Sequence, residues 1–283
     1  MSGRHRKPRK FSKERRRLLG GLSLLAVMVP ISAVTLHAAI AEVRSCQSTT
    51  EIVIGAAPQI EPVLQEHVDL YEESSPRAGS QCVSVSVTST VTSEQLTEPR
   101  DLDGWIPETA LWLSVPESEN VDHWAVREAS LVTDPVGVVL PDSSGDSVNL
   151  NDIEVNLDDP REDPASLLWL ISFGSQVDLI GDSSSTALPM SQFEVEAHNE
   201  ANPDDELPPL VSDATFDNFE FPFLADVNVD QQTAAALAHF QTSLNSDQFQ
   251  EQASDAGFGD PMPNVPNRDV EVVERVLANY DDR

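Results

Sequence analysis

Residues 51–87 decide the fold, and they read EIVIGAAPQIEPVLQEHVDLYEESSPRAGSQCVSVSV. The run 51–55 is short and β-rich, and residues 82–87 alternate between apolar and polar side chains with the period of a strand. The apolar residues between these runs recur at the spacing of one helix face: Ile60, Val63, Leu64, Val68 and Tyr71. Pro58 suits the start of this helix. The stretch predicts a strand–helix–strand unit whose two strands are parallel.

The rest of the chain continues the alternation of strands and helices. Strands are predicted near residues 104–107, 130–140, 176–180 and 219–224, the last bent or placed at a sheet edge by Pro222. Helices are predicted at residues 164–173 with Asp163 as a cap, at 231–244, at 247–256 ending at Gly257, and at 269–280. Residues 198–209 are acidic and contain proline, which predicts a solvated loop. The pattern is that of the α/β class.

The charge of the chain is divided very unevenly. The 283 residues hold 17 bases and 48 acids, a formal net charge of −31. Nine of the bases and one acid lie in residues 1–17, which leaves 8 bases and 47 acids, or −39, for residues 18–283. A body this negative repels phosphate backbones, so we expect no nucleic-acid partner. Hydrophobic residues make up 40% of the chain, which argues against wholesale disorder.

Residues 18–41 carry no formal charge and follow the basic stretch 1–17 directly. A helix of this length spans roughly 36 Å, enough to cross a hydrocarbon core of about 30 Å. The bases predict a cytoplasmic N-terminus, a single-pass transmembrane anchor and an extracytoplasmic body, which places the protein at the cell membrane. The segment is longer than a usual signal-peptide core, which favours retention. The small residues Ala39 and Ala41 leave cleavage before Glu42 open as the alternative.

The chain has two cysteines, Cys46 and Cys82, and both fall on the exported side. In an oxidising compartment the expectation is one disulfide, which closes a loop of about 37 residues and stabilises the fold by roughly 3.8 kcal/mol in the chain-entropy model. A reactive thiol or a pair of metal ligands is the alternative, and no neighbouring residue supports it.

These landmarks resemble the actinobacterial membrane-anchored substrate-binding-like domain, which has a type 2 periplasmic-binding-protein fold. The resemblance covers roughly residues 46–260 and rests on residues spread along the chain. They are Cys46, Ala56-Ala57-Pro58, Cys82-Val83, Asp103 with Trp105-Ile106-Pro107 and Trp112, Leu131 to Val136 as the crossover strand, Phe221-Pro222-Phe223, Ala234 to Phe240, and Ala256-Gly257-Phe258. The similarity is weak over residues 141–215.

The resemblance implies a two-lobed α/β domain at residues 46–260, with lobe 1 at about 46–130 and 216–260 and lobe 2 at about 131–215. Many relatives carry a von Willebrand factor A-type domain after it. Only 23 residues follow Asp260, so we expect a tail with a short helix at 261–283 in its place. The run 182–186, DSSST, mimics the metal motif of that second domain, and we interpret it as a polar loop or helix start.

The candidate ligand site follows from the architecture, because ligands of open α/β sheets bind beyond the carboxyl ends of strands and near helix N-termini. The candidate ligand-binding residues are Ala56, Ala57 and Pro58 in the first turn, Trp105, Ile106 and Pro107 at the third strand, and Thr133 and Asp134 at the crossover. In this interpretation Trp105 stacks on a ligand, and backbone donors near Gln59 hold an anion. The residues themselves favour a structural interpretation, in which Trp105 is core between the lobes and the prolines mark turns. The first turn has few hydroxyls, which argues against a small oxyanion.

No catalytic set accompanies this site. The sequence has no Gly-x-Ser-x-Gly elbow, no phosphate-binding glycine loop and no Cys-x-x-Cys, and no two histidines have the i, i+4 spacing of a zinc helix. Its acid clusters lack the spacing of a calcium loop. We therefore expect no enzyme activity, no cofactor and no metal site. The expected function is capture of a small ligand between two lobes. The alternative is an envelope interaction or structural protein that keeps the fold without binding a ligand.

Overall fold

A computed structural model describes residues 46, 48–98, 100–115, 121–140, 150, 153–173, 187–212, 218–263 and 270–281. The helices and strands reported below all belong to one compact unit, Ser48–Arg283. Within the described ranges, no helix combines the length and hydrophobicity that crossing a bilayer requires. The expected anchor at 18–41, the strand at 176–180 and the polar run 182–186 lie outside the described residues.

The elements follow one another in an α/β order. They are β1 (Thr49–Ala56), α2 (Glu61–Glu73), β2 (Arg77–Ala78), β3 (Gln81–Ser89), α3 (Thr92–Thr97), β4 (Gly104–Ile106), the 3-10 helix η1 (Ala110–Ser114), β5 (Trp124–Glu128), β6 (Asp134–Val139), α4 (Pro164–Phe173), β7 (Leu188–Ser191), α5 (Gln192–Ala201), β8 (Asn218–Phe219), β9 (Phe223–Asp226), α6 (Gln231–Leu244), α7 (Asp247–Asp255) and α8 (Val270–Asp281).

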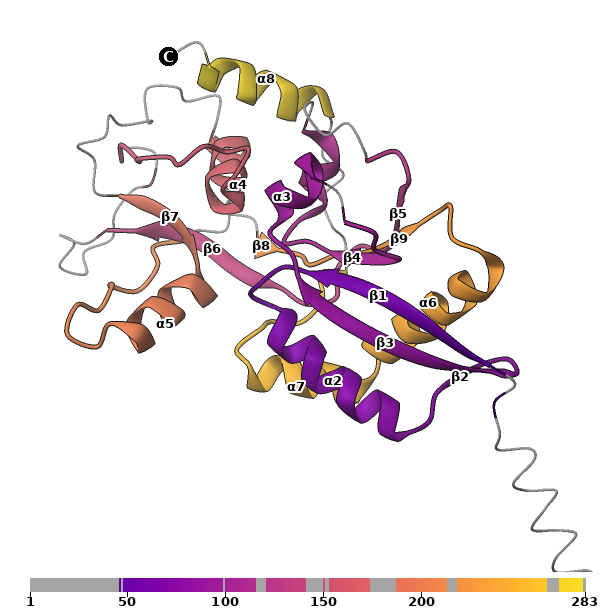
Figure 1. Ribbon diagram of the computed structural model, residues 1–283. Helices are drawn as coiled ribbons and strands as arrows, with labels where there is room; N and C mark the ends of the chain where they lie inside the picture. The colour runs from indigo at the N-terminus through magenta and orange to yellow at the C-terminus, as the bar shows by residue number, and fades with distance from the viewer. Residues whose placement is uncertain are drawn as a thin grey trace, which may run out of the picture. The chain divides into compact units, whose positions relative to one another are not determined.

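The larger sheet has six strands in the order β2-β3-β1-β4-β9-β5. Strand β1 pairs in parallel with β3, with Ile52 opposite Val85, and also in parallel with β4 (Figure 1). Strand β9 runs antiparallel to both β4 and β5. The predicted parallel strand–helix–strand unit is confirmed. The sheet is mixed because β9 returns from a distant part of the chain.

Helix α2 forms where the apolar stripe was predicted, and its buried residues include Val63, Leu64, Val68 and Tyr71. It begins later than expected. Pro58 lies before the helix and is exposed, while Pro62 occupies the first turn, where its missing N–H has no partner to lose. A proline does occupy the first turn of this helix, as predicted, but it is Pro62 and not Pro58.

The smaller sheet has three strands in the order β7-β6-β8, and both pairings are antiparallel. The chain passes from the larger sheet into β6 after residues 131–133 and returns through residues 220–222. Sequence analysis predicted one strand over 219–224. The structure divides that run into β8 and β9, one in each sheet, because Phe221 adopts a left-handed backbone with φ of 42° just before Pro222. The bend at Pro222 was predicted, but the change of sheet was not.

Most predicted helices are confirmed closely. Helix α4 has the predicted bounds, and Asp163 Oδ2 accepts a hydrogen bond from Ser166 N at 2.6 Å, as a helix cap does. Helix α7 ends before Gly257, whose φ of 93° suits glycine at this position. One prediction was wrong in part. Helix α5 continues to Ala201, so the acidic loop begins after that residue and not at residue 198.

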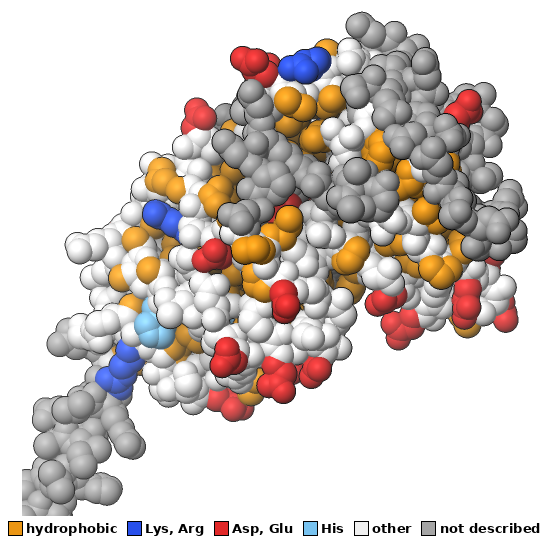
Figure 2. Space-filling view, turned by 180° about the vertical axis from the view of Figure 1, so that it is seen from behind, with side chains coloured by type: hydrophobic (Ala, Val, Ile, Leu, Met, Phe, Trp, Pro, Cys, Tyr) orange, Lys and Arg blue, Asp and Glu red, His pale blue; other side chains and the backbone are white. Residues whose placement is uncertain are grey.

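The buried apolar residues form one continuous cluster that includes members of both sheets, among them Trp105 and Val136. Both cysteines are oxidised and no described cysteine is free, so the predicted Cys46–Cys82 disulfide is confirmed. Seen from behind, the described surface shows acidic side chains distributed widely, with a few arginines between them (Figure 2). Acids spread in this way are solvated, as the composition suggested.

Candidate functional site

The first turn is fastened to the neighbouring strands by backbone hydrogen bonds. Ala57 N donates to Ile106 O at 2.8 Å, and Thr90 N donates to Ala56 O at 2.8 Å. The turn after β1 and the end of β4 therefore lie together at one edge of the larger sheet, as the strand order requires. The structure brings together the candidates that sequence analysis took from these two places.

The start of α2 is poorly suited to hold an anion. Ile60 N and Glu61 N both donate to Ala57 O at 3.1 Å, and the prolines at 58 and 62 have no N–H. The N-cap residue Ile60 makes no side-chain hydrogen bond, and Glu61 adds negative charge to the first turn. Anion binding at a helix N-terminus depends on free N–H donors and a positive field, and both are reduced here.

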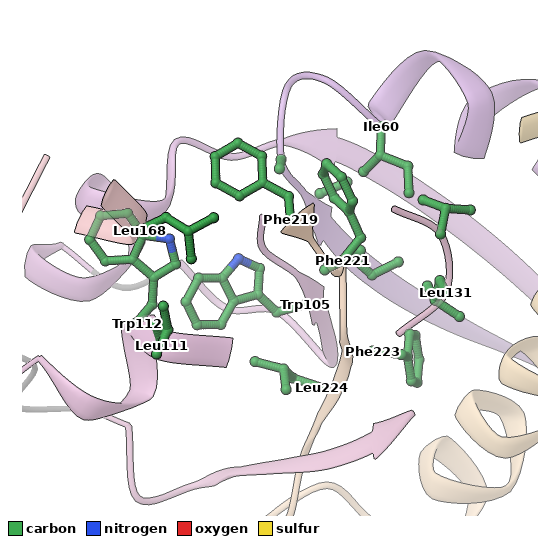
Figure 3. Packing of buried hydrophobic residues seen from close by; sticks show 14 of the residues in the cluster. Ile60, Trp105, Leu111, Trp112, Leu131, Leu168, Phe219, Phe221, Phe223 and Leu224 are labelled. Atoms are coloured by element: carbon green, nitrogen blue, oxygen red, sulfur yellow. The ribbon is translucent and has the colours of Figure 1, made fainter. Parts of the chain in front are cut away.

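Trp105 lies within the core. Its exposed fraction is 0%, and its ring centroid lies 5.6 Å from that of Trp124. Figure 3 shows Trp105 in a group with Trp112, Leu168 and Phe219, which come from η1, α4 and β8. The indole is therefore packed between the two sheets in this conformation, which agrees with the core interpretation of the residue.

Two buried glutamates lie beside this group, and sequence analysis did not select either of them. Glu108 Oε2 accepts from Thr92 Oγ1 at 2.6 Å. Glu220 Oε1 accepts from Thr109 Oγ1 at 2.8 Å and from Ala110 N at 2.9 Å. The backbone carbonyl of Glu108 also accepts from Glu220 N, so the return segment is bound to the chain that follows β4. The sequence signal for Glu220 was an acid between two phenylalanines in an apolar run.

The two candidates at the crossover, Thr133 and Asp134, are both hydrogen-bonded to other parts of the chain. Thr133 N donates to Gly259 O at 3.0 Å, and Gly259 N donates back to Thr133 O at 2.8 Å. Asp134 is the first residue of β6 and is buried against the start of α5, where its Oδ1 accepts from Phe193 N at 3.3 Å. Burial raises the pKa of Asp134 to about 6, and hydrogen bonds from the start of α5 oppose the rise.

A fourth acid, Glu194, lies in the first turn of α5. Ser191 and Glu194 form a capping box, in which Ser191 N donates to Glu194 Oε2 at 2.7 Å. Burial raises the pKa of Glu194 to about 7, and the charges of Asp163 and Asp134 raise it further. The pKa of Glu108 is also raised, mainly by burial and additionally by the charge of Asp163. The charge of Asp163 therefore acts on Glu194 within the smaller half and on Glu108, which follows β4 of the larger sheet.

We call this boundary the seam, and it comprises residues 105–112, 131–134, 163–168 and 219–223. Seven of the eight candidate residues are buried, and only Pro58 is exposed. The described ion pairs lie elsewhere, at Arg100 with Glu94 and at Arg161 with Asp159 and Asp281. Among the described residues, no group of three or more His, Cys, Asp or Glu side chains is placed to hold a metal ion. The seam offers apolar surface and hydrogen-bond acceptors.

Two larger hollows in the described part of the chain lie away from these candidates. One of about 510 Å³ is polar and lies before β4, and it is lined by Val53, Arg100, Asp101, Leu102, Asp103, His123 and Asp226. Another of about 230 Å³ lies between β9 and α6. A narrow third hollow includes Asp134 together with Phe193 and Phe258. The first of these hollows has no seam residue in its lining, and the second shares only Phe223 with the seam.

Comparisons with known proteins identify similar solved structures. No protein-family model and no curated protein matches the chain. Peb3 from Campylobacter jejuni matches with 12% identity and a TM-score of 0.48, over 74% of this chain and 99% of that one. The probable amino-acid ABC transporter extracellular-binding protein of Bacillus subtilis matches with 10% identity and a TM-score of 0.49, over 74% and 98%.

A third similar structure is the GluR0 ligand-binding core in complex with L-glutamate, with 12% identity and a TM-score of 0.46, over 73% of this chain and 97% of that one. The larger sheet of this chain is mixed and the smaller sheet is antiparallel, and helices pack against both.

Proposed function

We propose that this chain is a non-enzymatic solute-binding-like protein that captures a small ligand between its two sheets. The observation that carries the proposal is the connection between the sheets. The chain enters the smaller sheet after residues 131–133 and returns through 220–222, so two short segments join two α/β halves. Such paired connections allow one half to rotate against the other around a ligand.

In this proposal the described arrangement is the closed one. Trp105 and Ile106 have exposed fractions of 0%, so a ligand reaches them only when the halves separate. The acceptors available at the seam, including Glu108 and Asp134, favour a ligand that donates hydrogen bonds. The crowded start of α2 disfavours a small oxyanion, in agreement with the shortage of hydroxyls in that turn.

A thermal-shift screen of the purified protein against amino acids, amines, oxyanions and cell-wall fragments tests the proposal. A ligand that binds the folded state raises the melting temperature in proportion to the logarithm of its concentration. The shift is expected to disappear in Trp105→Ala and to persist in Leu70→Ala, whose side chain is exposed on α2. A screen without any concentration-dependent shift would count against ligand capture.

The second candidate function is an envelope interaction or structural protein that keeps this fold without a small ligand. The complete burial of Trp105, Phe219 and Phe221 favours it, because opening the seam exposes large apolar surfaces to water. Crosslinking in intact cells distinguishes the two. A silent ligand screen together with one reproducible protein partner supports the second function.

We also propose that residues 18–41 anchor the protein in the cell membrane, with the body outside. Fractionation followed by N-terminal sequencing of the mature protein checks this. An intact N-terminus in the membrane fraction is expected. A soluble protein that begins at Glu42 would show that the segment is a cleaved signal.

A further inference from the structure

The C-terminal helix α8 contacts both halves of the domain. It packs against η1, which follows β4 of the larger sheet, and against α4, which packs on β6 and β7 of the smaller sheet. Figure 1 shows α8, in yellow, near α4, and the two helices are in contact. Sequence analysis gave this helix no role.

One face of α8 is apolar and buried in this contact. Val273, Val276 and Leu277 are buried, with exposed fractions of 0%, 6% and 2%, and Tyr280 packs against the same core. These positions follow the i, i+3, i+4, i+7 spacing of a single helix face. Glu274 and Arg275 lie on the opposite face and are exposed. The apolar face of α8 therefore packs where the two halves of the domain meet.

Helix α4 requires a packing partner in addition to the smaller sheet. Its residues Leu167, Leu168, Trp169 and Leu170 are all almost completely buried, so α4 is apolar around most of its circumference. The smaller sheet covers only one side of such a helix. Helix α8 covers another side and at the same time reaches η1, where Trp112 is fully buried.

An ion pair fixes the end of α8 to the smaller half. Arg161, which precedes α4, donates from both terminal nitrogens to Asp281, at 3.0 Å to Oδ1 and 2.7 Å to Oδ2. A bidentate contact of this kind fixes the orientation of the two side chains as well as the distance between them. The pair is partly exposed, so it orients α8, while the aliphatic face supplies most of the attraction.

We infer that α8 is a strap that holds the two halves of the domain closed and that must leave η1 before the seam can open. The inference goes beyond the proposed function, since it concerns the distance between the halves whether or not a ligand exists. Where a ligand does exist, access to the seam is controlled from the C-terminal end of the chain.

Distance measurements between spin labels on the full chain test the strap. One label pair spans the halves, through Glu66→Cys on α2 and Ala197→Cys on α5, two exposed positions. A second pair, Glu66→Cys with Ala235→Cys on α6, lies on helices packed against the larger sheet and reports whether that half remains folded. The native Cys46–Cys82 disulfide is kept oxidised during labelling.

The strap is loosened by Val273→Ser with Leu277→Ser, and Glu274→Ala on the exposed face is the matched control. We expect a new, longer population for the α2–α5 pair in the double variant, with the α2–α6 pair unchanged. If the double variant does not fold, Leu277→Ala replaces it with the same expectation. An α2–α5 distribution equal to that of the control overturns the inference. A longer α2–α6 distance in a folded variant also overturns it, because the change is then not confined to the seam. Absence of a ligand affects none of these readings.

Discussion

Replacing Glu194 by Gln is expected to stabilise the protein at pH 8 and to leave its stability almost unchanged near pH 4. Glu194 accepts a hydrogen bond from Ser191 N at 2.7 Å within the capping box of α5. A glutamine carbonyl accepts the same bond, so the cap is retained. What the substitution removes is a carboxyl group that must ionise in a buried place beside Asp163 and Asp134.

The magnitude follows from the difference between the folded and unfolded pKa values. Burial raises the pKa of Glu194 from an ordinary 4.5 to about 7 in the folded protein. Between these values the folded state retains a proton that the unfolded state has lost, so the free energy of unfolding falls as pH rises. Each unit of pKa difference corresponds to about 1.36 kcal/mol, which gives a loss of up to about 3 kcal/mol by pH 8. The Gln variant does not suffer this loss.

Urea unfolding followed by tryptophan fluorescence at pH 4, 5, 6, 7 and 8 measures the effect. The difference in unfolding free energy between variant and wild type is expected to grow from near zero at pH 4 to up to about 3 kcal/mol at pH 8. Glu200→Gln, on the exposed side of the same helix, is the control and should follow the wild type. A Glu194→Gln variant no more stable than the wild type at pH 8, or offset equally at every pH, would refute the reasoning.

Three further substitutions test other features of the fold by the same denaturation assay. Gly104→Ala places a Cβ 2.7 Å from Ile54 Cδ1 and is expected to cost about 1–3 kcal/mol, so an unchanged midpoint would contradict this packing. Glu220→Ala leaves two buried donors without an acceptor and should cost about 1–3 kcal/mol at neutral pH, whereas Glu220→Gln should cost less. Replacing Cys46 and Cys82 together by Ser removes the disulfide and should lower the free energy of unfolding by roughly 3.8 kcal/mol. The wild-type protein with its disulfide reduced should then be as stable as the variant.

The fold was largely predictable because its signals are local. The alternation in residues 82–87 and the apolar stripe of α2 are read within a few residues, and both elements form where expected. The division of residues 219–224 between two sheets was not predictable in this way. It depends on which partner each half of the run finds far along the chain, and Phe219 and Leu224 are equally apolar and equally buried.

The candidate site was predictable only in its location. The turn after β1 and the end of β4 meet as the strand order demands, which places Ala57 beside Ile106. The interpretation of Trp105 as core between the lobes was available from the sequence, but its partners in η1, α4 and β8 were not, because those contacts span long sequence separations. The buried state of Glu108 was missed for the same reason. An isolated acid after a proline reads as a surface residue until the packing around it is known.

We expect the buried acids to make opening of the seam depend on pH. Glu108 belongs to the segment after β4 of the larger sheet, and Asp163 caps α4 of the smaller half. The charge of Asp163 raises the pKa of Glu108, so the two carboxyl groups repel one another when both are ionised. Separating the halves relieves this repulsion and returns both groups to water, and deprotonation therefore favours the open arrangement.

We expect the longer population of the α2–α5 label pair to grow in the strap-loosened variant as the pH rises above the ordinary glutamate pKa of 4.5, because burial raises the pKa of Glu108 above that value. Asp163→Asn keeps an oxygen acceptor for the Ser166 N–H while removing the charge, and it should flatten that rise. Because the labels report distance and not stability, the measurement separates opening from global unfolding, which the α2–α6 pair monitors in the same samples. A population that falls with rising pH, or that rises equally with Asn at position 163, would show that the repulsion across the seam does not govern its opening.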